Sequence, residues 1–217
     1  MRWSALDTLI AAATRDEADV LRAREQWSQL TGLVRSDHEL YGERSDAFVE
    51  WYILERPGAD GLPPVDRLLR AGAIDEADLP SVLALRRSYR SLFQVHRLHP
   101  GGVTIDDLLG GGRFDVDERR RLPGVGVGDT FEGRILPDPD APGRLLFSRT
   151  FLFHPREACK AVRAHAERAR AHGEPPAEVL FRLQRLRLRC TAYRHVPAER
   201  IYELADAPPG DIVKFSP

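Results

Sequence analysis

The alternation of apolar and polar residues between positions 91 and 116 predicts a β-hairpin that continues into a third strand. An apolar run from Leu92 to Leu98 is followed by the turn residues Pro100-Gly101-Gly102 and by a return strand that starts at Val103. Glycine and proline favour such a turn because glycine tolerates positive φ and proline restricts φ. A second glycine cluster at residues 110–112 precedes the next strand. We expect the rest of the chain to be organised around this hairpin.

Two further segments alternate in the same way. They run from Thr130 to Leu136 and from Arg144 to Phe153, and the Pro- and Gly-rich residues 137–143 connect them. The glycine-rich run at 122–129 lacks the Lys-Ser/Thr of a phosphate-binding loop, and a strand follows it instead of a helix. We therefore interpret that run as a turn. About five short strands with no helix between them predict an antiparallel sheet or a small β-barrel.

Apolar residues at helical spacing predict that residues 1–90 are mainly helical. The segment Thr14-Arg15-Asp16-Glu17 has the form of a capping box and predicts a helix that begins at Thr14 and stops at Gly32. A second helix is predicted over Asp46–Arg56, and its aromatic residues share one face that we expect in the core. A further helix is predicted from Leu79 through Tyr89, with arginines near its end, where positive charge suits the helix dipole.

The last third of the chain is predicted to be helical again. An alanine-rich helix follows Pro155, and a longer helix follows Pro175-Pro176. The longer helix has an apolar seam that fits packing within the chain and self-association equally well: Val179, Leu183, Leu186, Cys190 and Tyr193. We expect an α+β fold with helical residues 1–90, a β module at 91–153 and C-terminal helices with a tail at 154–217, forming one compact unit.

Composition excludes several classes of protein. The 217 residues carry a formal net charge of −1, so the chain as a whole has no field that would gather nucleic acid or anionic lipid. Cys159 and Cys190 are too few for a disulfide framework, and they lack the close spacing of a metal knuckle. The short apolar patch near the N-terminus fits neither a signal peptide nor a membrane span. These features predict a cytoplasmic protein with no membrane partner.

Candidate catalytic and metal-binding residues are few. His96 and His99 lie three apart in a predicted strand and so point to opposite faces, although His154 and the carboxylates of Asp106 and Asp107 would extend the set. Adjacent strand residues also face opposite ways, so we interpret Asp106-Asp107 as turn residues. No nucleophile signature accompanies the cysteines. We expect no enzyme activity, metal or cofactor, and the alternative is an enzyme built on His96, Asp106 and Asp107.

The strongest basic feature lies on the last long helix. Arg182, Arg185 and Arg189 lie off the apolar seam, and such a face can bind phosphates. Glu178 and Glu199 flank the face, and no aromatic residues interleave with it. We therefore favour a solvated or internally paired face, and nucleic-acid binding through these arginines is an alternative.

Short segments spread over most of the chain carry a first resemblance: Phe48-Val49-Glu50-Trp51-Tyr52, Glu55-Arg56-Pro57, Ser91-Leu92-Phe93-Gln94-Val95, Asp106-Asp107-Leu108-Leu109-Gly110, Val127-Gly128-Asp129, Arg194-His195-Val196-Pro197 and Ile201-Tyr202. Together they resemble an uncharacterised group of bacterial proteins of the myxobacterial type, and this resemblance implies no function. A similar helix-plus-strand region occurs in proteins with a SEC-C metal-binding motif. The Cys-rich motif itself is absent here, so no zinc is implied.

A second set of residues resembles the PilZ domain, a small β-barrel that binds cyclic di-GMP. The chain has Arg86-x-x-x-Arg90, then a strand, then Asp106-x-Leu108-x-x-Gly111, where the family pattern has a serine in place of Leu108. The resemblance implies that two arginines one helical turn apart clamp phosphate and stack on guanine. A cyclic-dinucleotide sensor that uses Arg86, Arg90, Asp106 and Gly111 is therefore an alternative function.

Because no catalytic, metal or phosphate-loop motif is present, the sequence favours a non-enzymatic adaptor or regulatory protein. Such a protein acts through contacts with a protein partner, which the sequence does not identify, or through self-association. The cyclic-dinucleotide sensor and the nucleic-acid binder are the alternatives that a ligand-binding experiment separates from it.

Overall fold

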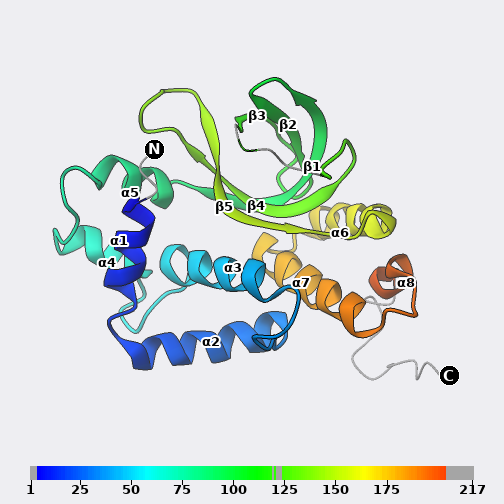
Figure 1. Cartoon of the computed structure of the whole chain (residues 1–217), viewed down its shortest axis with the longest axis horizontal. Helices are drawn as coiled ribbons and strands as arrows, with labels where there is room; N and C mark the ends of the chain where they lie inside the picture. The colour runs from blue at the N-terminus through cyan, green and yellow to red at the C-terminus, as the bar shows by residue number, and fades with distance from the viewer. Residues whose placement is uncertain (1–3, 119, 121–123, 204–217) are drawn as a thin grey trace.

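A computed structural model describes residues 4–118, 120 and 124–203, which form the α+β fold that the sequence predicts (Figure 1). The helices before the sheet are α1 (Ser4–Ala13), α2 (Glu17–Thr31), α3 (Tyr41–Leu54), α4 (Pro64–Arg70) and α5 (Leu79–Arg86). The strands are β1 (Tyr89–His99), β2 (Gly102–Asp107), β3 (Arg113–Asp117), β4 (Thr130–Pro137) and β5 (Leu145–Phe153). The chain continues through a 3-10 turn, η1 (Arg156–Ala158), and through α6 (Cys159–His172), α7 (Pro176–Ala192) and α8 (Ala198–Glu203).

The five strands form a ring in the order β1-β2-β3-β5-β4, and β4 pairs back onto β1. All pairs are antiparallel except β3 with β5, which are parallel and meet at the single pair Asp117 and Leu146. The ring is therefore closed only weakly on that side and is not a full barrel. The register of β1 against β2 shifts between Val95 and Arg97, where a bulge bends the long strand.

The interior of the ring is apolar because alternate residues of each strand point inward. Phe131 of β4 lies at its centre, with its ring centroid 5.8 Å from both Phe93 and Phe147. The buried residues of this cluster come from all five strands: Phe93, Val95, Val103, Ile105, Val116, Phe131, Ile135 and Phe147. The alternation that predicts the strands also selects these inward positions.

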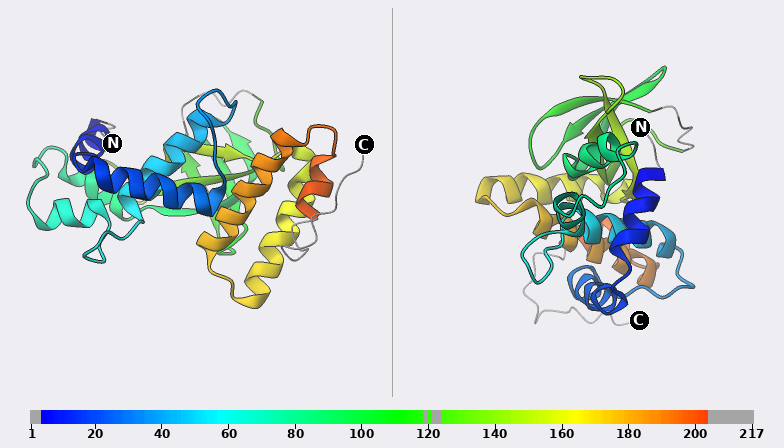
Figure 2. Two further views of the ribbon diagram at one scale, coloured as in Figure 1. Left: turned by 90° about the horizontal axis from the view of Figure 1, so that it is seen from below. Right: turned by 90° about the vertical axis from the view of Figure 1, so that its left-hand side faces the viewer.

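The helices lie on one side of the ring in two layers. α3 lies against β5 and α7 against β1, and α2 lies on the far side of these two helices (Figures 1 and 2). The N-terminal helices share an aromatic core to which α7 contributes: Trp27, Phe48, Trp51, Tyr52 and Phe181. The prediction that the aromatics of α3 belong to the core is confirmed, since Phe48, Trp51 and Tyr52 are buried.

Several predicted helix boundaries are wrong. The N-cap of α2 is Asp16, whose Oδ1 accepts a hydrogen bond from the Asp19 N–H at 3.0 Å. Thr14 instead directly follows α1, and its hydroxyl donates to the Ile10 carbonyl at 2.8 Å. α3 begins at Tyr41, five residues before the predicted start. α5 ends at Arg86, so the predicted extension of that helix through residue 89 is wrong.

The apolar seam of α7 is used within the chain. Val179, Leu183 and Leu186 are buried together with α6 and α8, whereas Tyr193 lies beyond the helix end and is 43% exposed. None of the helices within the described residues is long and apolar enough to cross a membrane. The predicted tail at 207–217 and the first two residues of the glycine-rich run at 122–129 lie outside the described residues.

Candidate functional site

The two arginines of the PilZ-like pattern do not form a helical pair. Arg86 is the last residue of α5 and forms an ion pair with Asp66, whereas Arg90 lies in β1. The Arg90 Nε atom is 3.2 Å from the Glu55 carboxylate, and its guanidinium lies 5.4 Å from the ring centroid of Phe181. The expected spacing of one helical turn is therefore wrong, because the helix ends before Arg90.

The other two residues of that pattern are engaged elsewhere. Asp106 lies on the outer face of β2, where its carboxylate is 3.1 Å from His96 Nδ1 and 2.6 Å from Arg113 Nε. These contacts to Arg113 and His96 hold the pKa of Asp106 below its ordinary value. Gly111 lies in the β2–β3 turn with a φ of 79°. The four predicted residues thus have separate partners and do not converge on one site.

Residues next to the predicted ones do converge. A pocket of about 380 Å³, here called the mouth pocket, lies where β3 departs from β5, near the start of β1 and the ends of β2 and β4. Its wall includes Arg87, Tyr89, Asp107, Gly110, Phe114 and Leu145. Successive strand residues face opposite sides, so moving by one position exchanges one face of the sheet for the other.

Asp107 is the buried polar centre of the mouth pocket, with an exposed fraction of 4%. Its Oδ2 accepts a hydrogen bond from the Tyr89 hydroxyl at 2.8 Å, and its Oδ1 accepts from Ser91 Oγ at 2.5 Å and from the Leu109 N–H at 3.0 Å. Burial, together with the hydrogen bond to Asp107, raises the pKa of Tyr89. The interpretation as turn residues is wrong for Asp106, which lies within strand β2. Asp107 is the last residue of β2, and its carboxylate and carbonyl accept hydrogen bonds from the N–H groups of Leu109 and Gly111 in the β2–β3 turn.

A second surface feature, the α2–α3 groove, has a volume of about 440 Å³. Trp27 of α2 and Phe48 of α3 form its buried floor, while Leu33 and Tyr41 at its rim are 71% and 37% exposed. The guanidinium of Arg24 lies 4.8 Å from the ring centroid of Phe48. Sequence reasoning missed this groove because it placed the start of α3 after Tyr41. The apolar Leu33 directly after the helix stop was the available signal.

The face of the sheet toward the helices is buried but polar. Glu50 of α3 accepts hydrogen bonds from Arg134 Nε and Ser148 Oγ, both at 3.2 Å. Arg134 also contacts Glu55 and donates to Ser88 Oγ at 3.1 Å. This set of side chains, here called the buried polar layer, joins α3 to β4 and β5.

Glu132 and His154 extend the layer toward α7 and α8. Burial raises the pKa of Glu132 to about 7, even though Gln184 donates a hydrogen bond to its Oε2 at 2.7 Å. Burial lowers the pKa of His154 to about 3, and its Nδ1 lies 2.7 Å from the Tyr202 hydroxyl. The facing atoms, Glu132 Oε1 and His154 Nε2, are 3.8 Å apart. Both residues are 4% exposed and packed between the sheet and the helices, so we interpret the pair as structural.

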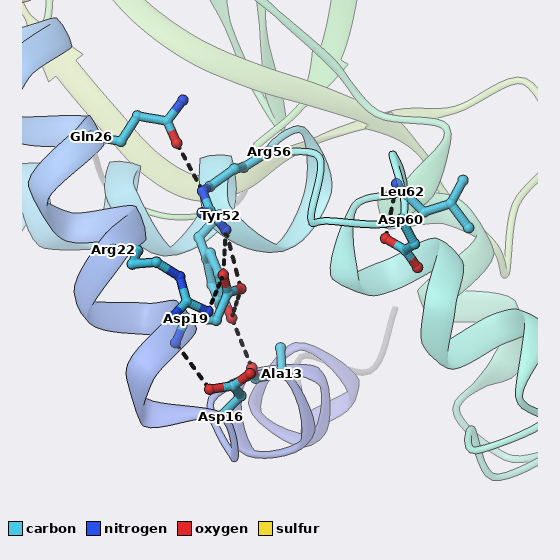
Figure 3. Close-up of polar contacts among 9 residues, drawn as sticks. All are labelled: Ala13, Asp16, Asp19, Arg22, Gln26, Tyr52, Arg56, Asp60 and Leu62. Carbon is cyan, nitrogen blue, oxygen red and sulfur yellow. Dashed lines mark hydrogen bonds and ion pairs between the residues drawn. The ribbon is translucent and has the colours of Figure 1, made fainter.

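A second buried ionic cluster joins α2 and α3 (Figure 3). Arg56 Nη1 lies 3.1 Å from both carboxylate oxygens of Asp19, and Arg56 Nε donates to Gln26 at 2.9 Å. The Tyr52 hydroxyl lies 3.1 Å from Asp19 Oδ2. Burial alone would raise the pKa of Asp19, but the bonds from Arg56 outweigh it and hold the pKa below its ordinary value.

The arginine face of α7 is partly used by the fold. Arg182 forms an ion pair with Glu174, and Arg185 donates to the Leu30 carbonyl. Arg189 is exposed.

In partly open five-stranded barrels that bind oligonucleotides, strands 2 and 3 form the binding face and aromatic side chains stack on the bases. The outward side chains of β2 and β3 here pair with one another, Thr104 with Asp115 and Arg113 with Asp106.

The described part of the chain contains potential metal ligands and two cysteines. No group of three His, Cys, Asp or Glu side chains there lies close enough to hold a metal ion. Cys159 and Cys190 are both free thiols, and burial raises the pKa of Cys190 to about 11. Comparison with known proteins adds no family: no family model, no curated protein and no solved structure matches the chain.

Proposed function

We propose that this chain is a non-enzymatic adaptor or regulatory protein that binds a partner polypeptide in the α2–α3 groove. One observation carries the proposal: large apolar side chains, Leu33 and Tyr41, stand exposed beside a groove whose floor is Trp27 and Phe48. Exposed apolar patches of this kind mark interaction surfaces, and Trp, Tyr and Arg are the residues that most often dominate binding energy.

The groove favours a partner segment in which an aromatic or aliphatic side chain stands next to a carboxylate. The apolar side chain would cover Leu33 and Tyr41. Arg24 is exposed and stacks on Phe48, and within the described residues it forms no ion pair. A carboxylate beside the apolar anchor would therefore meet a cation that forms no ion pair with the described residues.

Selection from a random peptide library tests the proposal, followed by measurement of each selected peptide's affinity by fluorescence anisotropy. We expect enriched peptides to carry an apolar residue beside Asp or Glu. Leu33→Ser and Tyr41→Ala should each weaken their binding by about tenfold or more, which corresponds to ~1.4 kcal/mol. Val127→Ser is the matched control, because Val127 is 69% exposed and lies outside the groove.

A charge exchange tests the carboxylate directly. Arg24→Glu should weaken the binding of the acidic peptides. The same peptides with Lys in place of the acidic residue should bind this variant more tightly than they bind the unmodified chain. Failure to enrich any peptide, or affinities that Leu33→Ser and Val127→Ser alter equally, would overturn the proposal. Self-association that Leu33→Ser abolishes would also overturn it, since a second copy would then occupy the groove.

A further inference from the structure

We propose that the mouth pocket is a second, independent binding site and that its ligand is a small zwitterion with an apolar body, such as an apolar α-amino acid. Its volume of about 380 Å³ lies within the usual range of small-molecule sites, roughly 300–1,000 Å³. Such sites combine mostly apolar walls with a few polar groups that fix the orientation of the ligand. The mouth pocket has both features.

The polar groups of the pocket are one anion, one cation and one phenol. The Tyr89 hydroxyl donates its proton to Asp107, so the lone pairs of the phenol oxygen remain available to a donor from the ligand. The buried carboxylate behind it adds negative charge at the same place. An ammonium group satisfies both conditions, because it donates hydrogen bonds and carries positive charge.

Arg87 supplies the opposite charge on the wall of the same pocket. Its side chain is exposed, and within the described part of the chain it forms no ion pair. A guanidinium matches a carboxylate in charge and in geometry. Arg87 together with the Tyr89–Asp107 pair therefore complements a molecule that carries a carboxylate and an ammonium group.

The remaining wall is apolar and would receive the body of the ligand. Phe114 and Leu145 are only partly buried, although they belong to the edge of the ring interior. They are left uncovered because β3 and β5 meet at one residue pair only. An aromatic or branched aliphatic side chain would cover them.

Gly110 leaves space for the hydrogen bond between Tyr89 and Asp107 at the polar end of the pocket. A Cβ atom at this position would lie 2.3 Å from Asp107 Oδ2 and 2.7 Å from the Tyr89 hydroxyl oxygen, closer than real contacts allow. Only glycine leaves room for the hydrogen bond between these two groups. Gly110→Ala would therefore displace the Tyr89 hydroxyl without changing any charge.

Thermal unfolding and calorimetric titration with L-phenylalanine and L-leucine test the proposal. At about 100 times its dissociation constant, a ligand should raise the unfolding temperature by roughly 5–11 °C. Arg87→Gln and Tyr89→Phe should each weaken binding by about tenfold or more. Arg86→Gln is the matched control, because Arg86 is one residue away and pairs with Asp66 outside the pocket.

Two partial ligands separate the charges. Phenylacetate lacks the ammonium group and phenethylamine lacks the carboxylate, so we expect each to bind more weakly than L-phenylalanine. Equal binding of all three would overturn the zwitterion, and no heat or temperature shift with either amino acid would overturn the site. A shift with cyclic di-GMP that Arg87→Gln abolishes would replace the amino acid with a nucleotide.

Discussion

Arg134, on the face of the sheet that the helices cover, has surroundings opposite to those of Arg24 and Arg87 at the two candidate sites. Arg134 is buried and contacts Glu50, Glu55 and Ser88, so the fold uses its charge entirely. Arg24 and Arg87 are exposed, and within the described residues neither has a carboxylate partner. The same residue type therefore serves architecture in one region and is available to ligands in the other.

This difference has a physical consequence. A buried ion pair contributes little when it replaces apolar packing, but removing one partner leaves an uncompensated charge in the interior. Removing an exposed arginine costs the protein little stability, because water solvates the groups around it. Substitutions in the two regions should therefore change different quantities, stability in the first and affinity in the second.

The largest effect is expected for Arg134→Met, which removes the charge and keeps an unbranched, flexible side chain. Glu50 would then be buried beside Ser148 with no cation, so we expect a loss of about 3–5 kcal/mol in the free energy of unfolding. Urea denaturation measures it. The double variant Arg134→Met, Glu50→Gln should recover part of the loss, and a double variant no more stable than the single one would contradict the pairing.

A pH-dependent effect of similar size is expected at Glu132. Burial raises the pKa of Glu132 in the folded chain from 4.5 to about 7, so folding binds this proton more tightly. Its contribution to stability is complete below pH 4.5 and is lost as the pH rises through about 7. In Glu132→Gln the group does not titrate. The unfolding free energy of the unmodified chain relative to this variant should fall by about 3 kcal/mol across that range.

The comparison of the two chains cancels the titration of groups that lie far from Glu132. Thermal or urea unfolding at a series of pH values gives the difference directly. Parallel curves of unfolding free energy against pH for the unmodified chain and Glu132→Gln would show that burial does not raise the pKa of Glu132.

A smaller effect is expected at the mouth pocket, for Tyr89→Phe without ligand. The substitution removes one of three donors to Asp107 and leaves the apolar ring in place. We expect a loss of about 1–2 kcal/mol, because a buried carboxylate oxygen loses a partner. Urea denaturation at neutral pH checks this value, and a loss below that of Arg86→Gln would contradict a structural role for the hydroxyl.

The smallest effect on stability is expected at Arg24 and Arg87. Arg24→Ala and Arg87→Gln should each change the free energy of unfolding by less than about 0.5 kcal/mol, because both side chains are exposed. The same urea series measures them beside Arg134→Met. A loss comparable with that of the buried arginine would remove the distinction between the two regions.

The strands were predictable and the burial of their outer face was not. The alternation along β4 and the Gly and Pro turns are local signals, and they locate Phe131 and Ile135 inside the ring. The same alternation puts Glu132 and Arg134 on the opposite face of the strand, but it does not tell what covers that face. Their partners come from Gln184, 52 residues away, and from Glu50, 84 residues away, and local patterning carries no information on such contacts.

The candidate sites were predictable only to within one residue or one helix turn. Sequence spacing selected Arg86 and Asp106, whereas Arg87 and Asp107 line the mouth pocket. The error follows from where α5 ends, since a residue that moves from helix to strand changes its direction. The α2–α3 groove depends on the packing of residues 32–40 between two helices, which tertiary contacts determine.

The most direct test of the adaptor function is the affinity of selected peptides for the unmodified chain, for Leu33→Ser and for Val127→Ser. The groove predicts that peptides with an apolar residue beside a carboxylate bind the unmodified chain and Val127→Ser equally, and bind Leu33→Ser about tenfold or more weakly. Equal affinity for all three proteins, with each shown to be folded by its unfolding transition, would contradict binding in the groove.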